Sequence, residues 1–321
     1  MRVVVALGGN ALLQRGEPPD SEVQAHHVAA AVEALAPIGR DHELVVTHGN
    51  GPQIGLLALE SARDPALSHP YPLDVLGAQT QGMVGYWLLQ ALQNALPGRQ
   101  VACVITQTLV AADDPAWADP TKFIGPVYDE PEARRLADER GWQVRADGGA
   151  WRRVVASPDP VKVVEESLLE LLLWQEAIVV CAGGGGVPVV RDADGRLQGV
   201  EAVVDKDRTS AILAASVKAD ALLLLTDVPG VVAGFGTAGA RTIGRTTTDE
   251  LRTLDLPAGS MRPKVEAVCE FAERTGRFAA IGALADAESI LRGEAGTFVA
   301  PIGYLADSRH EMTFDPGGKA P

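Results

Sequence analysis

The chain has 321 residues, of which 46% are hydrophobic, so it can bury a substantial core as one large or two modest domains. Its net charge of -14 argues against a nucleic acid or an acidic membrane surface as a partner, because the summed field repels both. An anionic substrate would therefore need to be held by local positive charge.

The cysteines and histidines give no metal or disulfide signal. Cys103, Cys181 and Cys269 are widely spaced and fit neither a zinc motif nor a disulfide framework, so we expect buried thiols. His26 and His27 are adjacent on an expected helix and face different directions, which disfavours a metal site.

The N-terminus is strand-like rather than a signal peptide and no apolar run is long enough to span a membrane, so we expect a cytoplasmic protein.

Hydrophobic patterning predicts strands alternating with helices, and hence an α/β fold. Strand-like segments are expected at 2–7, 44–47, 101–110, 178–181, 222–225, 278–281 and 296–299. Helices are expected at 20–36, after the turn at 49–51, and at 73–96, 158–172, 209–217, 247–254, 263–275 and 287–291. A hairpin is expected at 191–195, and the tail from 302 is polar.

Residues 111–158 differ from the rest of the chain. They hold three tryptophans, many prolines and glycines, and a single predicted helix at 129–141. A long stretch with so little apolar periodicity is typical of an excursion from the core, so we expect a lid or arm here.

Three expected strands end in glycine turns. The segment 44–47 runs into Gly49-Asn50-Gly51 with Pro52 at a helix start, the first strand runs into Gly8-Gly9-Asn10, and a third runs into glycines 183–186. Such turns bring backbone N–H groups and a positive helix end to an anion. None matches a P-loop or a dinucleotide fingerprint. A plain tight turn is the alternative for each alone, whereas three together predict an anion site at the carboxyl edge of one parallel sheet.

Lysine is scarce, because only six of the 28 basic residues are lysines. Lys162, Lys218 and Lys319 fit solvated positions. The other three lie in distinctive contexts: Lys122 in Pro-Thr-Lys, Lys206 in Asp205-Lys-Asp207, and Lys264 after Met-Arg-Pro. A compact ammonium is a point charge suited to a moving phosphoryl group. A surface charge cluster is the alternative for the Asp-Lys-Asp motif.

Several motifs together resemble the carbamate kinases of the amino-acid kinase family. They are Ala6-Leu-Gly-Gly-Asn-Ala11, His48-Gly-Asn-Gly-Pro-Gln53, Leu76-Gly-Ala-Gln-Thr-Gln-Gly82, Pro120-Thr-Lys122 with Ile124-Gly-Pro126, Trp151-Arg-Arg-Val-Val-Ala-Ser-Pro158, Cys181-Ala-Gly-Gly-Gly-Gly186, Asp205-Lys-Asp207, Thr226-Asp-Val228, and Gly259-Ser-Met261 with Pro263-Lys264. They run in order from the first strand to about Pro301.

The resemblance implies an open three-layer α/β/α sandwich with a largely parallel central sheet and a protruding arm. It implies a homodimer and reversible phosphoryl transfer between ATP and carbamate, with Mg²⁺ carried by ATP or ADP, usually run from carbamoyl phosphate and ADP. It further implies an N-terminal lobe (1–200, with the arm at about 111–158) for carbamate and phosphoryl, and a C-terminal lobe (201–321) for the nucleotide.

The resemblance also suggests roles for individual residues. Backbone groups around the first two glycine turns would hold the phosphoryl and carbamate: Gly8, Gly9, Asn10, Gly49, Asn50 and Gly51. Lys206 and Lys264 would neutralise phosphate charge with Asp207 holding both ammoniums, and Lys122 would close on the carbamate side. Nucleotide contacts would come from Thr226, Asp227, Val228, Met261 and Lys264. The metal ligands are not predicted.

One departure and two alternatives stay open. Arg262 stands where the family pattern usually has glycine, and we hypothesise that it reaches the nucleotide phosphates. A family relative could phosphorylate another small acid, although such relatives mostly carry a lysine on the first strand, which is absent here. The other alternative is a non-catalytic anion sensor on the same fold, which the retained lysines disfavour.

Overall fold

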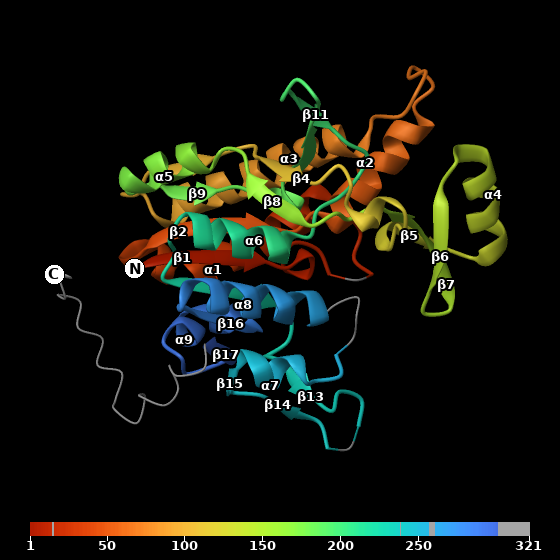
Figure 1. The fold of residues 1–321 in the computed structure, drawn as a ribbon. Helices are drawn as coiled ribbons and strands as arrows, with labels where there is room; N and C mark the ends of the chain where they lie inside the picture. The colour runs from red at the N-terminus through yellow and green to blue at the C-terminus, as the bar shows by residue number, and fades with distance from the viewer. Residues whose placement is uncertain (15, 238, 257–260, 301–321) are drawn as a thin grey trace.

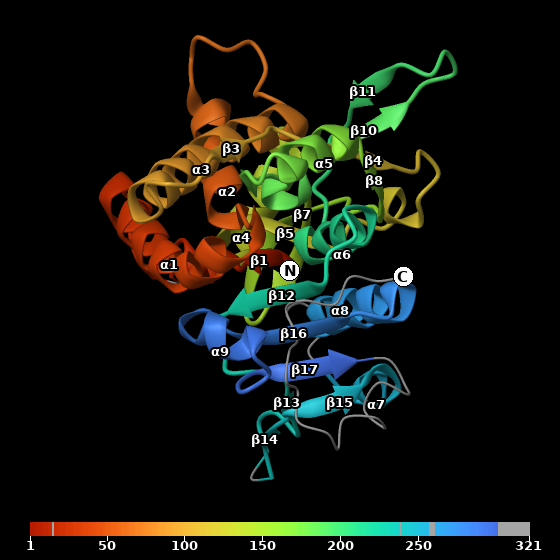
Figure 2. The same cartoon turned by 90° about the vertical axis from the view of Figure 1, so that its left-hand side faces the viewer.

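The computed structural model describes residues 1–14, 16–237, 239–256 and 261–300, and its centre is one eight-stranded sheet (Figures 1 and 2). Its strands are, in spatial order, β15 (Arg245–Thr247), β17 (Thr297–Ala300), β16 (Phe278–Ala283), β12 (Ala221–Thr226), β1 (Arg2–Leu7), β2 (Glu43–His48), β9 (Ile178–Val180) and β3 (Val101–Cys103). Every neighbouring pair is parallel except β16 with β17. The largely parallel central sheet is thus confirmed.

Alternate residues of the strands face two different helical layers, as Figure 2 shows for the helices on either side of the sheet. Val3, Val5 and Leu7 pack on one side and Val4 and Ala6 on the other. The first layer contains α1 (Ser21–Asp41), α3 (Leu73–Ala95) and α9 (Ala287–Leu291). The second contains α5 (Glu166–Trp174), α6 (Lys206–Ser216), α7 (Thr248–Arg252) and α8 (Met261–Thr275). The predicted three-layer sandwich is therefore confirmed.

Smaller sheets flank this core. A four-stranded sheet contains β11 (Leu197–Gly199), β10 (Val187–Arg191), β4 (Gln107–Val110) and β8 (Pro160–Val163), and the turn from β10 to β11 is the predicted hairpin. A two-stranded ribbon joins β13 (Val232–Ala233) to β14 (Arg241–Thr242). The described residues also form four short 3₁₀ turns: η1 (Gly9–Ala11), η2 (Pro115–Trp117), η3 (Gly183–Gly185) and η4 (Leu284–Asp286).

The excursion at 111–158 is an arm that projects beside α2 (Gly51–Arg63), as Figure 1 shows on the right. It contains the predicted helix, α4 (Glu130–Arg140), capped by the Asp129 side chain. It also contains a three-stranded antiparallel sheet of β5 (Lys122–Tyr128), β7 (Ala150–Val155) and β6 (Gln143–Asp147), which the sequence does not predict. Strand β5 is interrupted by Gly125-Pro126, β7 has two consecutive arginines and β6 is mostly polar, so none has the regular apolar pattern by which a strand is predicted.

Three predicted boundaries are wrong for reasons of tertiary packing. Helix α1 continues through Pro37 to Asp41 instead of ending at 36, because Ile38 and Gly39 in its last turn are buried and their packing outweighs the hydrogen bond lost at Pro37. The segment 101–110 forms two strands in different sheets, since β-rich composition does not reveal a strand's partners. The helix predicted from 158 begins only at Glu166, because β8 pairs with β4 at the edge of its sheet, where a proline is tolerated.

Within the described residues, no helix is both long and apolar enough to cross a membrane. Two sequence features lie outside those residues: the polar tail from 302, and Gly259-Ser260 of the motif that precedes Met261.

Candidate active site

Three glycine turns meet at the carboxyl edge of the central sheet, as predicted. They follow β1, β2 and β9, which are mutually parallel neighbours. The turns and the predicted charged residues line one cavity of about 320 Å³. Its lining includes Gly8, Gly9, Asn10, Gly49, Asn50, Gly51, Lys122, Gly184, Lys206, Asp207 and Lys264. The fold therefore brings together residues that lie up to 256 positions apart in the sequence (264 minus 8).

The turn backbone is only partly free to bind a ligand. The N–H of Gly8 donates to Leu225 O at 2.9 Å, and that of Gly49 donates to Leu7 O at 3.0 Å, so both extend the sheet. Gly9 and Gly51 instead begin η1 and α2, and first-turn N–H groups have no partner within their own helix. The positive ends of these elements thus supply the donors that an anion would meet.

Both asparagine side chains of the turns are committed to protein partners. Asn10 Nδ2 donates to Asp227 Oδ2 at 2.8 Å, and Asn50 Nδ2 donates to Thr80 Oγ1 at 2.8 Å. Gly184, at φ +62°, packs so closely on the Asn50 amide that any side chain at 184 would collide with it. These contacts fix the turns before any ligand arrives, which is the condition for preorganised charge stabilisation.

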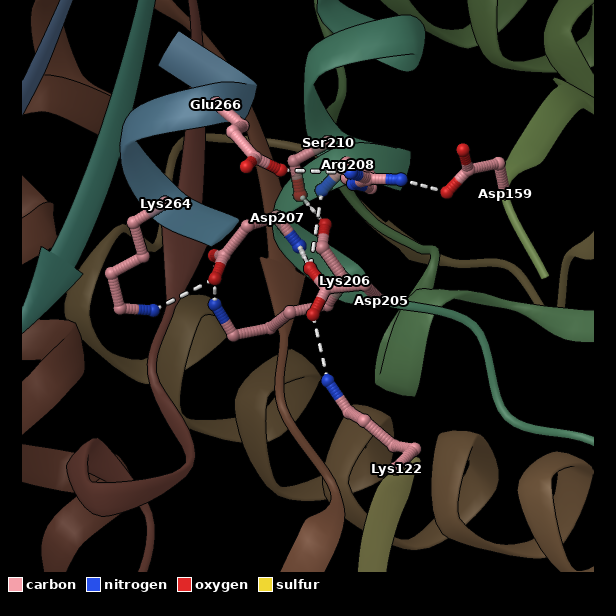
Figure 3. A network of polar contacts seen from close by, with 9 residues as sticks. All are labelled: Lys122, Asp159, Asp205, Lys206, Asp207, Arg208, Ser210, Lys264 and Glu266. Atoms are coloured by element: carbon pink, nitrogen blue, oxygen red, sulfur yellow. Dashed lines mark hydrogen bonds and ion pairs between the residues drawn. The ribbon is translucent and has the colours of Figure 1, made fainter. Parts of the chain in front are cut away.

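A lysine–aspartate–lysine network forms the charged wall of the cavity (Figure 3). Asp207 lies in the first turn of α6 and accepts from Lys206 with one carboxylate oxygen. Its other oxygen accepts from Lys264 Nζ of α8 at 2.7 Å. The three side chains are only 7 to 15% exposed, so one carboxylate holds two nearly buried ammonium groups in place.

The electrostatics of the network follow from burial and pairing. Burial opposes the charge of Asp207, but the Lys206 and Lys264 ammoniums outweigh it and hold the pKa of Asp207 well below its usual range. Burial also opposes the charge of Lys264, yet the attraction of Asp207 outweighs it and raises the pKa of Lys264. For Lys206, burial dominates and lowers its pKa, aided by repulsion from Lys264. The network carries one net positive charge when all three groups are ionised.

The arm delivers Lys122 to the same wall. Lys122 begins β5, and its Nζ lies 2.7 Å from Asp205 Oδ2, as Figure 3 shows. The other oxygen of Asp205 caps α6 by accepting from the backbone N–H groups of Asp207 and Arg208 at 2.9 and 3.3 Å. This capping role of Asp205 was not predicted from the sequence. It could have been predicted, because Asp205 lies shortly before an expected helix and aspartate is a preferred N-cap residue.

A second cavity, of about 590 Å³, adjoins the first. The predicted nucleotide residues Thr226, Asp227, Val228, Met261 and Lys264 all line it. Asn10, Thr226, Asp227 and Lys264 line both cavities, so the two form one continuous depression. Further apolar lining residues, from the β13–β14 ribbon and its surroundings, were not predicted: Val232, Phe235 and Leu256. Val232 and Leu256 lie in no charged or glycine-rich motif, whereas Phe235 lies between Gly234 and Gly236, a signal that could have marked it.

Arg262 does not reach this depression. Its Nη2 donates to Leu256 O at 3.2 Å and lies near Asp255, 3.8 Å from Oδ1. Arg262 is also absent from the described residues that line either cavity. This arrangement does not support the hypothesised contact of Arg262 with the nucleotide phosphates, which a nucleotide-binding measurement tests.

His48, at the end of β2, was also missed as a site component. Its ring is buried beneath Gly183, where any added side chain would collide with it. Burial lowers the pKa of His48 to about 4, so the ring is neutral at pH 7. Nδ1 lies 3.0 Å from Gly49 O, and since a carbonyl only accepts, Nδ1 carries the proton. His48 is a neutral spacer between two glycine turns.

The described residues contain no group of three or more His, Cys, Asp or Glu side chains that could hold a metal ion. The His27 ring instead pairs with Glu17 at 2.7 Å. Cys181 and Cys269 are buried and Cys103 is partly buried, all as free thiols. Among the described residues, Asp227 is the one carboxylate that lines both cavities and is not paired to a lysine.

These features define a phosphoryl-transfer site on a parallel α/β sheet, and comparison with known proteins agrees. The model of the amino acid kinase family matches residues 1–282. The chain belongs to the amino acid kinase family.

Within this family, several similar proteins are carbamate kinases. The chain is 52% identical to a carbamate kinase of Rhizobium meliloti over 93% of each chain. It is 45% identical to a carbamate kinase of Thermococcus kodakarensis, covering 93% of this chain and 98% of that one. It also resembles the solved structure of carbamate kinase from Giardia lamblia bound to AMP-PNP, at a TM-score of 0.86, 36% identity and coverage of 93% and 98%.

Proposed function

We propose that this chain catalyses reversible phosphoryl transfer between ATP and carbamate, run toward ATP from carbamoyl phosphate and ADP in the catabolic direction. The observation that carries the proposal is the Lys206–Asp207–Lys264 network beside the glycine turns. The same reaction class belongs to the carbamate kinases that the chain resembles over nearly its whole length.

The site needs no general base. Carbamate is already an oxyanion, so its oxygen attacks the γ-phosphorus directly while the bond from that phosphorus to the β-phosphate bridging oxygen breaks. Phosphoryl transfer of this kind depends on positioning and charge stabilisation. The neutral, buried His48 is consistent with this mechanism, because its Nδ1 donates a hydrogen bond to Gly49 O and has a structural role.

The residues divide the work as follows. Gly9, Gly51 and their neighbouring turn residues hold the transferring phosphoryl by backbone N–H groups, with Gly8 and Gly49 tying the turns to the sheet. Lys206 and Lys264 neutralise charge on the β- and γ-oxygens, and Asp207 positions both. Lys122 approaches from the arm on the carbamate side.

The nucleotide occupies the larger cavity, against the C-terminal strands. Thr226, Asp227, Val228 and Met261 line it, and Lys264 lies at its junction with the phosphoryl cavity. The N-terminal part of the chain, 1–200, would thus hold the carbamate and the C-terminal part the nucleotide. Mg²⁺ bound with ATP or ADP would neutralise part of the phosphate charge, and Asp227, which lines both cavities, would be the carboxylate available to hold it.

We also propose that the chain forms a homodimer in the cytoplasm. Helix α5 exposes an apolar face, with Leu168, Leu171 and Trp174 spaced by three residues and Trp174 76% exposed. Apolar side chains gathered on one helix face are typical of surfaces covered in an assembly.

The direct test mixes the protein with ADP, Mg²⁺ and carbamoyl phosphate and measures ATP with a coupled assay. We expect ATP formation that requires all three components. Transfer to another small acid but not to carbamate would favour a different family relative. Nucleotide binding without any transfer would favour an anion sensor.

A further inference from the structure

The backbones of α2 and β5 meet at two glycines, Gly55 and Gly125. A methyl group added to Gly55 would lie 2.6 Å from Cα of Gly125 and 2.9 Å from its N. Carbon atoms in good contact are about 3.5–4.0 Å apart, so this space is closed to any side chain. The helix and the strand approach this closely only because position 55 lacks one.

The strand bends at the contact. Gly125 has φ +70°, a conformation that side chains rarely adopt. Its carbonyl accepts a hydrogen bond from Arg152 Nη2 at 2.9 Å, and the pairing of β5 with β7 shifts register between Ile124 and Tyr128. The bend wraps the root of the arm around α2, where Figure 1 shows β5 beside α2.

An apolar cluster holds the contact closed. Ile54 of α2, Ile124 of β5 and Val155 of β7 pack together with Leu73 and Leu76 of α3. All five side chains are buried, so the root of the arm is joined to the body by a small core of its own. The position of β5 is therefore set by packing rather than by the surface ion pairs of the arm.

This contact lies between two groups of the active site. Gly51 begins α2 one helical turn before Gly55, a separation of about 6 Å along the axis. Lys122 precedes Gly125 by three residues, about 10 Å along β5. A shift of β5 away from α2 would thus move Lys122 relative to the turn that holds the phosphoryl.

We propose that Gly55 is a positioning residue that sets the reach of Lys122 by letting β5 lie directly against α2. The inference rests on the proposed function, in which Lys122 acts on the carbamate side. Gly55 itself touches no substrate, since its contact is with the backbone of Gly125.

The test compares Gly55→Ala with Gly82→Ala. Gly82 lies within α3 and has open space where a methyl group would be added, so it is a matched control for the helical substitution. We expect Gly55→Ala to lower kcat/KM for carbamoyl phosphate by about 10- to 100-fold, because a misplacement of about 1 Å can cost on the order of 100-fold. ADP affinity by calorimetry should stay near that of the parent in both variants.

A double-mutant cycle with Lys122→Ala separates positioning from a purely structural role. If Gly55 acts through Lys122, Gly55→Ala should cost little further activity once Lys122 is absent. The same fold-loss in both backgrounds would overturn the inference, as would parent-like activity of Gly55→Ala. No ATP formation by the parent would overturn the proposed function, and this inference with it.

A second variant keeps the test decisive if Gly55→Ala does not fold. Val155 pairs with Lys122 across β5 and β7 and belongs to the apolar cluster. Val155→Ala removes packing without a clash and should lower kcat/KM for carbamoyl phosphate by several-fold. That loss should also vanish in the Lys122→Ala background, and a loss that persists there would overturn the inference.

Discussion

The Nζ atom of Lys264 lies 2.7 Å from Oδ2 of Asp207, which joins the first turns of α8 and α6 across 57 residues of sequence. The contact places an ammonium of one helix beside the lysine that precedes the aspartate in the other, and like charges are tolerated there because Asp207 lies between them. Phosphate oxygens are the natural further partners of such a pair.

Asp207→Asn tests the positioning of both lysines. Without the negative charge the ammoniums repel each other, so we expect turnover to fall by more than ten-fold while nucleotide KM changes less. We base that scale on the losses of about 10²–10³ seen when one preorganised group is removed. Steady-state kinetics check this, and an unchanged kcat with only a raised nucleotide KM would contradict it.

The same substitution predicts a pH effect on stability. The pKa of Asp207 is lowered in the folded chain, so its contribution is fully present above the unfolded value of about 3.9 and is lost as pH falls toward the folded pKa. The difference in unfolding free energy between parent and Asp207→Asn should be constant from pH 7 to 5. It should shrink below about pH 4, as measured by urea unfolding; a difference that grows on acidification would oppose this assignment.

His48 predicts a second and separate pH window. Its folded pKa of about 4 is below the usual 6.5, so the neutral ring stabilises the fold above pH 6.5 and this stability is lost between 6.5 and 4. Relative to His48→Gln, the parent should lose on the order of 3 kcal/mol across that window, since each unit of pKa shift is about 1.4 kcal/mol. Urea unfolding at pH 7, 5.5 and 4.5 measures this. If the free energy of unfolding falls equally with pH in the parent and in His48→Gln, His48 is not held neutral.

Lys122→Ala tests the arm. Lys122 is 41% exposed and pairs with Asp205 rather than with the lysine network, so its loss should leave nucleotide affinity near that of the parent. Turnover of carbamoyl phosphate should fall by on the order of 100-fold, as expected for one charge-stabilising group. Calorimetry and the coupled assay on one preparation measure both quantities. ATP synthesis close to that of the parent would mean that a residue other than Lys122 supplies the positive charge near carbamate.

Arg262→Gly restores the residue that the family pattern usually has. Because the guanidinium contacts Leu256 O and Asp255 and does not itself line either cavity, we expect ADP affinity to change by less than about five-fold, corresponding to one exposed hydrogen bond of about 1 kcal/mol or less. Calorimetry decides the matter. A loss of affinity of 100-fold or more would mean that Arg262 turns to the phosphates when nucleotide is bound.

Much of the site could be predicted because its signals are local. Gly8, Gly49 and Gly51 follow buried strands, and a strand that ends in a glycine turn before a helix places its backbone at the sheet edge. Because the chain has few lysines, the sequence drew attention to Lys122, Lys206 and Lys264, and all three line the same cavity. Lys162 and Lys218, expected to be solvated, are exposed.

The remainder depends on contacts between distant segments. Nothing near Gly55 in the sequence shows that Gly125 will lie against it, and His48 is buried beneath Gly183 of the turn that follows β9. The arm sheet was missed because Val144 and Ala146 are the only apolar residues of β6 and β5 is interrupted by Gly125 and Pro126. Such strands are defined by their partners rather than by a hydrophobic pattern.

The most direct test of the account is the rate of ATP formation from carbamoyl phosphate and Mg-ADP by the parent, Lys206→Ala and Lys162→Ala. Lys162 is an exposed lysine paired with Glu166 outside both cavities, so its variant controls for the loss of a lysine. We expect parent-like turnover for Lys162→Ala and a loss of at least about 100-fold for Lys206→Ala, matching about 2.7–4 kcal/mol of transition-state stabilisation. Turnover of a folded Lys206→Ala within a few-fold of the parent, at saturating substrates, would contradict the central role of the lysine–aspartate–lysine network.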